Sequence, residues 1–275
     1  MKIRILVAVI CVPVLFIVIF FLPPYVFAGV IALICAISAY ELMHSVGNCG
    51  NERITIYVVF AAALTPVGAY FGVSMLVFLA VLLCLMVFTF AEAIFAFGKR
   101  RPVKLVHIMI ALLGGSLIPL MLSTLVSMRN MPEGRLIVLL PVVSAFMTDG
   151  GSYFTGVTLG KRRILPLVSP KKTVEGFIGG LCVGMAAILV YGAVLVGVTM
   201  HYIYFWALLL YGFIGSVMTQ LGDLAFSLIK REFEIKDYGR ILPGHGGILD
   251  RFDSMVFVAP AMYLLATVVP AIIVR

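Results

Sequence analysis

The sequence predicts an all-α polytopic membrane protein with about nine transmembrane helices. Two features of its composition carry this prediction. Apolar residues make up 63% of the 275 residues and charged residues only 12%, whereas soluble domains contain roughly 25% charged residues. The mean hydropathy of +1.18 is too high for a soluble globular domain or a disordered chain, because neither could hide so much apolar surface from water.

Nine apolar segments are separated by charged residues, proline or glycine, and a transmembrane helix needs about 20 such residues. The first segment has the charged start and the small-residue motif of a signal peptide, but its length and the spans that follow favour a retained helix. We expect spans at residues 5–22, 25–45, 54–70, 73–97, 104–127, 135–155, 176–198, 202–229 and 250–274.

The basic residues predict the orientation of these helices. With nine spans, 17 of the 20 Lys and Arg residues fall on the N-terminal side of the membrane, and only Arg129, Arg135 and Arg275 fall on the other side. Lys and Arg concentrate in cytoplasmic loops, so we expect the N-terminus in the cytoplasm and the C-terminus outside. The net charge of +8 then reflects topology, and we expect no nucleic-acid partner.

Acidic residues within the spans indicate a site at the cytoplasmic face. A carboxylate in a transmembrane helix costs about 2.5–3.5 kcal/mol on insertion scales. A proton relay or an ion channel would spread such groups through the membrane, but here they lie near the cytoplasmic helix ends. We expect Glu41 and Glu92 to be structural, by pairing with Lys or Arg or by snorkelling to a loop. The other acids of this kind are Asp149, Asp223, Asp250 and Asp253.

Asp223 differs from the structural acids because it belongs to a polar stripe on an otherwise apolar helix. Gln220, Asp223, Ser227 and Lys230 are spaced at i, i+3, i+7 and i+10. This spacing places all four on one helix face. The stripe leads directly into the basic loop that follows.

A glycine-rich loop precedes the last predicted helix. Gly244, Gly246 and Gly247 lie just before a helix whose first turn contains Asp250 and Asp253. Backbone N–H groups at a helix N-terminus form a natural phosphate cradle. Helix capping by the two aspartates is the alternative interpretation. Two carboxylate clusters beside a basic, glycine-rich loop predict phosphates held through Mg²⁺.

A second basic loop joins two of the later spans. In it, Pro170 precedes Lys171 and Lys172, and Thr173 with Glu175 resembles a cap for the next helix. Topology and attraction to lipid headgroups explain many basic loops. For Lys171 and Lys172 we favour phosphate binding over that alternative.

Glycines in two predicted helices indicate how the helices pack. Gly176, Gly180 and Gly184 recur every four residues, which gives a small-residue face that lets transmembrane helices approach closely. In the preceding span, Asp149 is followed by the pair Gly150-Gly151. A Gly-Gly pair beside an intramembrane acid predicts a broken helix that lines a polar cavity.

A long segment near the C-terminus resembles the signature of the phosphatidate cytidylyltransferases (CDP-diacylglycerol synthases). It reads S-L-I-K-R-E-F-E-I-K-D-Y-G-R-I-L-P-G-H-G-G-I-L-D-R-F-D-S, from Ser227 to Ser254. Residues 168–176 and 220–224 resemble further stretches of this family, so the resemblance covers roughly residues 145–255. Val157 and Phe226 depart from it, because many relatives carry a basic residue and a Glu there.

The resemblance implies a Mg²⁺-dependent transfer of the cytidylyl group from CTP to phosphatidic acid, which gives CDP-diacylglycerol and pyrophosphate. Asp223 and Asp250 are expected to hold the metal with Asp253 in support, and the site allows a second metal ion. His245 is expected to donate to a phosphate or to protonate the leaving group. The cations expected to neutralise phosphate charge are Lys171, Lys172, Lys230, Arg231 and Lys236.

Further substrate-binding candidates and partners follow from the same resemblance. We expect the protein in the cell membrane, with its active site facing the cytoplasm and with membrane lipids around it. Relatives suggest a homodimer, for which the N-terminal helices of residues 1–100 would supply the interface. Residues 101–175 would form the middle helices and basic loop, and residues 176–275 the catalytic helices. The remaining candidates for substrate binding are Asp149, Thr173, Gly246, Gly247 and Arg251.

Two alternative functions stay open at this point. A CTP-dependent lipid-alcohol kinase would use the γ-phosphate and release CDP instead of pyrophosphate. An ion-coupled transporter would use Asp149 and Asp223 as midplane carboxylates. The position of the acids on one side of the membrane and the lack of a recognisable inverted repeat disfavour the transporter.

Overall fold

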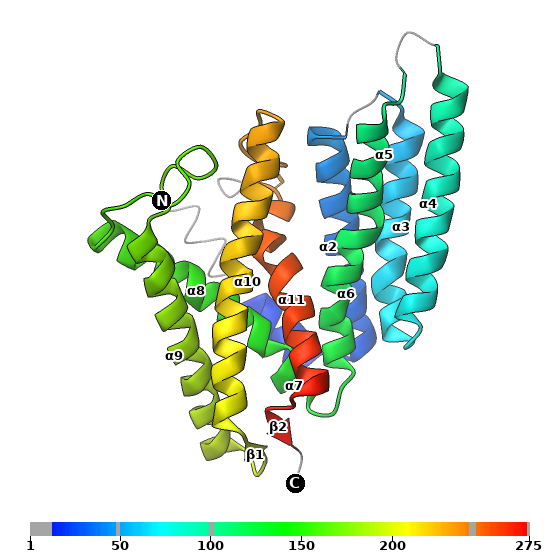
Figure 1. The fold of residues 1–275 in the computed structure, drawn as a ribbon. Helices are drawn as coiled ribbons and strands as arrows, with labels where there is room; N and C mark the ends of the chain where they lie inside the picture. Colours follow the sequence, from blue (N-terminus) through cyan, green and yellow to red (C-terminus); the bar gives the residue numbers. More distant parts are fainter. Residues whose placement is uncertain (1–12, 48–49, 99–101, 242–245, 274–275) are drawn as a thin grey trace. The chain divides into compact units, whose positions relative to one another are not determined.

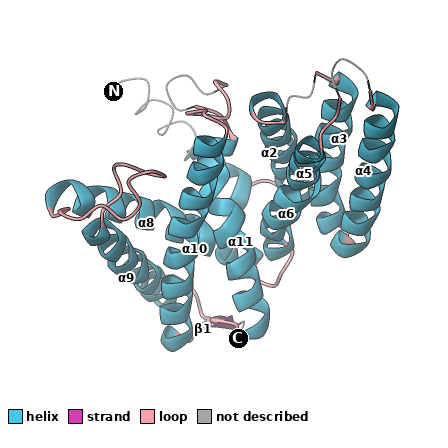
Figure 2. Ribbon diagram, turned by 45° about the horizontal axis from the view of Figure 1, so that its top comes forward, coloured by secondary structure: helices cyan, strands magenta, loops and turns pink. Residues whose placement is uncertain are grey.

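The computed structural model describes residues 13–47, 50–98, 102–241 and 246–273, and most of these residues are helical (Figure 1, Figure 2). Two short strands, β1 (Tyr202–Ile203) and β2 (Ile272–Ile273), and one π-helix, η1 (Leu113–Leu117), accompany the α-helices. The α-helices are α2 (Pro24–Ser45), α3 (Glu52–Tyr70), α4 (Ser74–Ala96), α5 (Leu105–Leu112), α6 (Ile118–Arg129), α7 (Gly134–Ile137), α8 (Leu139–Thr158), α9 (Val174–Val198), α10 (Phe205–Glu232) and α11 (Leu249–Val268).

The observed helices agree with the predicted transmembrane segments. Among the described residues, eight helical segments are long and apolar enough to cross a membrane. Two of them are composite, because α5, η1 and α6 form one and α7 with α8 forms another. The first predicted span, residues 5–22, lies partly within residues 1–12, outside the described residues, and residues 13–20 are helical. These apolar helices indicate a membrane protein.

The chain forms two compact units that interleave in sequence. The first unit contains residues 1–127 and 233–252, and the second contains residues 128–232 and 253–275. Residues 233–252 hold most of the family signature. This part of the signature therefore folds with the hydrophobic N-terminal helices.

In the first unit, α3 packs against both α2 and α4 (Figure 1). The π-helix η1 contacts all three of these helices. Its two glycines allow the close approach. Gly114 approaches Leu42 of α2, and Gly115 approaches Leu85 of α4 and Val58 of α3. A side chain at either glycine would overlap these neighbours, so the close packing of this span depends on them.

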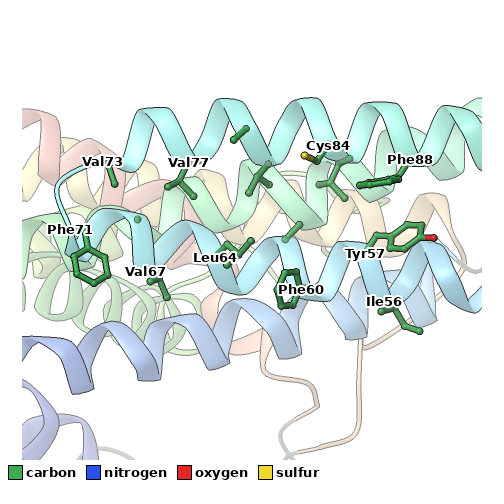
Figure 3. A pocket seen from close by; sticks show the side chains of 15 residues that line it. Ile56, Tyr57, Phe60, Leu64, Val67, Phe71, Val73, Val77, Cys84 and Phe88 are labelled. Atoms are coloured by element: carbon green, nitrogen blue, oxygen red, sulfur yellow. The ribbon is translucent and has the colours of Figure 1, made fainter.

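An apolar groove of about 590 Å³ lies between α3 and α4 (Figure 3). Side chains of both helices point into it, among them Phe60 and Leu64 of α3 and Val77 and Phe88 of α4. The 15 residues that line it include no charged side chain. The groove therefore suits apolar packing and offers no charged group.

In the second unit, α9 packs on α8 through the predicted small-residue face. A methyl group built on Gly180 would overlap the Ser152 hydroxyl and lie 2.8 Å from the carbonyl oxygen of Thr148. Gly176 and Gly184 are equally close to α8. The prediction that these glycines allow close helix approach is confirmed.

The predicted helix break at Gly150-Gly151 is wrong, because α8 continues through both residues. Gly151 lies against Val183 of α9, where a methyl group would come within 2.6 Å of the valine Cβ. This glycine therefore serves helix packing, and it does not open the helix. Asp149 is consequently presented by a regular helix.

The last helix is shorter than predicted. It ends at Val268, well before residue 274, because Pro270 cannot continue an α-helix and disfavours helical geometry in the residue before it. The chain then forms β2, which pairs antiparallel with β1 and places Tyr202 opposite Ile273. Residues 202 and 203, predicted as the start of a helix, therefore form a strand.

The contact between α8 and α9 predicts that Gly180→Ala destabilises the protein. The added methyl group must displace Ser152 or the α8 backbone, and overpacking of this kind costs about 1–3 kcal/mol. Gly197→Ala is the matched control, because it lies in the same helix and its methyl group meets no atom within 4 Å. Thermal unfolding in detergent measures both variants. An equal apparent Tm for the two would contradict the packing described.

Candidate active site

A Lys–Asp ion pair lies at the centre of a polar cluster in the second unit. Lys172 Nζ is 2.7 Å from Asp223 Oδ2, and the two side chains are 25% and 33% exposed. Lys172 belongs to the loop before α9, and Asp223 lies on α10. The bond between two ionised groups is short and strong. The structure thus brings together a predicted phosphate-binding cation and a predicted metal ligand.

The polar stripe predicted on α10 is observed. Gln220 Nε2 donates to a backbone carbonyl of α9 at 3.2 Å, and Ser227 Oγ donates to Asp223 Oδ1 at 3.4 Å. Lys230 Nζ lies 4.0 Å from Asp253 Oδ2 of α11. The stripe therefore faces the other helices of this unit and positions Asp223 and Lys230 for polar contacts.

Asp149 joins this cluster from α8. It interacts electrostatically with Asp223, Asp253 and Lys172. With Lys230 beside Asp253, the cluster contains three carboxylates and two ammonium groups. When all five are ionised, the cluster carries an excess of one negative charge, which favours the binding of a cation.

The basic loop between α8 and α9 is fastened at its two ends. Thr173 Oγ1 accepts the N–H of Gly176 at 3.1 Å and caps α9, as predicted. The carboxylate of Glu175 accepts the N–H groups of Lys161 and Arg162 at 2.9 and 3.2 Å. These bonds tie the start of the loop to the first turn of α9.

The backbone around Lys172 is also held in place. The N–H of Ile164 donates to the carbonyl oxygen of Lys172 at 3.2 Å. Arg231 Nε, at the end of α10, donates to the carbonyl oxygen of Val168 at 3.2 Å. Arg231 and Lys171 are exposed, so both predicted phosphate-binding cations are accessible to solutes.

Asp250 organises the signature segment in the first unit. Its Oδ2 accepts the N–H groups of Tyr238 and Gly247 at 2.9 and 3.0 Å, and the residue is only 8% exposed. Asp250 therefore closes the loop that precedes its own helix. This is the behaviour that the capping alternative predicted.

Glu41 contacts the same segment from α2. Its two carboxylate oxygens accept the N–H groups of Ile248 and Leu249 at 3.0 and 2.9 Å. The prediction that Glu41 pairs with Lys or Arg or snorkels is therefore wrong. The first N–H groups of a helix carry partial positive charge and favour an anion. Here protein carboxylates bind the N–H groups of residues 247–249, which belong to the region predicted to cradle phosphate.

Glu92 is structural, as predicted. Its carboxylate accepts a hydrogen bond from Asn51 Nδ2 at 2.8 Å and lies 3.7 Å from an Arg53 guanidinium nitrogen. These partners belong to the cap and first turn of α3. Glu92 therefore joins α4 to α3.

Four other predicted residues have simpler outcomes. His245 lies outside the described residues. Gly246 has a φ of +84°, a backbone conformation that favours glycine. Lys236 and Arg251 are exposed, so solutes can reach both side chains.

Comparison with known proteins identifies the family. A sequence model described as the Cytidylyltransferase family matches residues 2–269. The chain belongs to this family. The resemblance predicted from the signature segment is therefore confirmed.

Phosphatidate cytidylyltransferases from several bacteria are similar to this chain. The protein of Bacillus subtilis (strain 168) is 45% identical over 141 residues, which cover 51% of each chain. The proteins of Staphylococcus saprophyticus and Staphylococcus aureus (strain COL) are 47% identical over 133 residues, which cover 48% of this chain and 50% of theirs. The chain spans about half the length of the curated relatives it matches.

The carboxylates around Asp223 fit a Mg²⁺ ion that arrives with a nucleotide. In the part of the chain that the structure describes, no three His, Cys, Asp or Glu side chains form a ready metal site. Mg²⁺ is usually held by one or two carboxylates together with substrate phosphates, and seldom by a cage of protein groups alone. The oxygen donors around Asp223 meet that requirement.

The sequence analysis missed the roles of two residues. Ser254 donates its backbone N–H and its hydroxyl to Asp253 Oδ1 at 2.7 and 3.4 Å, and its place within the signature was the available signal. Glu41 was treated as a structural acid with a nearby partner. Its actual partners are about two hundred residues away in sequence, and no local pattern indicates them.

Proposed function

We propose that this cytidylyltransferase transfers the cytidylyl group of CTP to phosphatidic acid, giving CDP-diacylglycerol and pyrophosphate in phospholipid biosynthesis. The Lys172–Asp223 pair is the observation that carries the proposal. It places a cation suited to phosphate and a carboxylate suited to Mg²⁺ within 2.7 Å of each other. The names of the similar bacterial proteins support the choice of substrates.

In the proposed reaction, a phosphate oxygen of the lipid attacks the α-phosphorus of CTP. The bond from the α-phosphorus to the bridging oxygen of the β-phosphate breaks, and pyrophosphate leaves. Such a transfer depends mainly on positioning and on neutralising negative charge. Lys172 and Lys230 would bind phosphate oxygens, with help from Lys171, Arg231 and Lys236 at the exposed rim.

The acidic residues have a complementary role in this proposal. When Lys172 turns to a phosphate, Asp223 loses its lysine partner and becomes available to a metal ion. Asp223 would hold Mg²⁺ with support from Asp253, and Asp149 would add negative charge beside them. The expected contribution of Asp250 to the metal stays a prediction. The bound ion would screen the triphosphate and favour departure of pyrophosphate.

We also propose that the active site faces the cytoplasm, where CTP is available. Seventeen of the 20 Lys and Arg residues fall on the side of the candidate site when the predicted spans alternate across the membrane, which supports this orientation. The homodimer and the absence of a nucleic-acid partner stay predictions.

The direct test of this function is the identity of the products. Purified protein with CTP, Mg²⁺ and phosphatidic acid should release pyrophosphate and form CDP-diacylglycerol, and CTP should stay intact without the lipid. Release of CDP would indicate the lipid-kinase alternative, and no CTP turnover would contradict the proposal. In sealed vesicles, added CTP should be consumed only when the cytoplasmic face is outside.

The metal assignment predicts that Asp223→Asn and Asp250→Asn each lower turnover by roughly a hundredfold or more. Asn keeps the size of Asp but lacks the anionic oxygen that Mg²⁺ prefers, and several kcal/mol of transition-state stabilisation is lost at about 1.4 kcal/mol per decade. In Asp250→Asn, the amide oxygen of the new side chain can still accept the two backbone N–H groups, so folding is retained.

The matched control for these variants is Glu92→Gln, which alters a structural acid and should change turnover far less. Steady-state rates at limiting Mg²⁺ provide the measurement. Near wild-type rates for both Asp variants would show that the metal assignment is wrong.

A further inference from the structure

We propose that Glu41 is a positioning residue for the transfer reaction, although it lies in the hydrophobic first hundred residues. The proposal rests on the proposed function, since it concerns the segment that contains Asp250. Glu41 is 3% exposed and lies near the end of α2. Its carboxylate holds the first turn of α11 through the N–H groups of Ile248 and Leu249.

The geometry of this contact is that of a helix cap supplied by a distant helix. The first N–H groups of α11 have no partner within their own helix. Residues 246–248, which directly precede the helix, include no Ser, Thr, Asp or Asn that could cap it locally. The carboxylate of Glu41 binds two consecutive N–H groups at 3.0 and 2.9 Å. It therefore fixes both the start and the direction of the helix.

Two glycines of the signature segment are shaped to accept this carboxylate. Methyl groups built on Gly239 and on Gly247 would each overlap the carboxyl group of Glu41. The two glycines therefore leave the space in which the carboxylate lies. Neither Gly239 nor Gly247 has a positive φ, so what restricts these two positions is the space that the carboxylate occupies.

Glu41 and Asp250 act on neighbouring parts of one backbone segment. Asp250 binds the N–H groups of Tyr238 and Gly247, and Glu41 binds the next two N–H groups along the chain. Asp250 is thus held by the loop that it closes and by the helix turn that Glu41 anchors. Loss of Glu41 should let this turn shift, and a misplacement of about 1 Å at a reacting centre can cost roughly a hundredfold in rate.

The test compares Glu41→Gln, Glu41→Asp and Gly239→Ala with two controls. Gln keeps one acceptor but presents an NH₂ group to a backbone N–H, and Asp keeps the charge but is one methylene shorter. Gly239→Ala displaces the carboxylate without removing it. The controls are Glu92→Gln and Gly29→Ala, the latter because its methyl group meets no atom within 4 Å.

We expect Glu41→Gln and Gly239→Ala to lower kcat by roughly tenfold or more while KM for CTP changes little, and Glu41→Asp to restore part of the rate. Hydrogen exchange at residues 246–252 should become faster in the two impaired variants, with an apparent Tm close to that of the controls. Wild-type kcat in Glu41→Gln would overturn the proposal. The proposal would also be overturned if Glu41→Gln and Glu41→Asp lost kcat equally and both losses were explained by a lower apparent Tm.

Hydrogen exchange separates this proposal from the proposed function. If the wild-type protein does not turn over CTP, the proposed function fails, and the anchoring of residues 246–252 is still measured by exchange in Glu41→Gln. Faster exchange limited to this segment would then support the anchor, and unchanged exchange would reject it.

Discussion

The structure depends on one constraint, which is that every carboxylate placed in an apolar helix needs a partner. An ionised group that is buried without one is costly. Two kinds of partner bear on the site in the described residues. Asp223 and Asp253 lie beside lysines, whereas Glu41 and Asp250 accept backbone N–H groups.

The two kinds of partner have different consequences for function. A lysine can exchange a carboxylate for a phosphate, because both are anions and the ammonium group is on a flexible stem. A backbone N–H at a helix start cannot move without moving the helix. The lysine-paired acids are therefore suited to binding a substrate and its metal, and the backbone bonds of Glu41 and Asp250 hold the signature segment in shape.

Close helix packing is what brings the lysine to its partner. The hydroxyl of Thr173 caps α9 and lies among Gly156, Gly160 and Gly176, each of which would crowd it if it carried a methyl group. Lys172 directly precedes this cap. The glycines of α8 and α9 thus determine where the ion pair with Asp223 forms, which connects helix packing in the membrane to the chemistry of the site.

Much of this could be predicted from the sequence, because long apolar runs, the i, i+3, i+7 stripe of α10 and the small-residue face of α9 are local patterns. The signature segment likewise indicated the family. The unbroken helix at Gly150-Gly151 could not be predicted, because the reason for Gly151 is Val183 on another helix. The backbone partners of Glu41 could not be predicted for the same reason, since they come from a segment that is distant in sequence.

The central claim is that Lys172 and Asp223 take part in the reaction and do not merely stabilise each other. A charge swap, with Lys172→Asp and Asp223→Lys in one protein, tests it most directly. The swap can re-form the ion pair, so we expect an apparent Tm near that of the wild type. We expect no CTP turnover, since the cation and the carboxylate would have exchanged places relative to phosphate and metal. Turnover near the wild-type rate in the swapped protein would contradict the account.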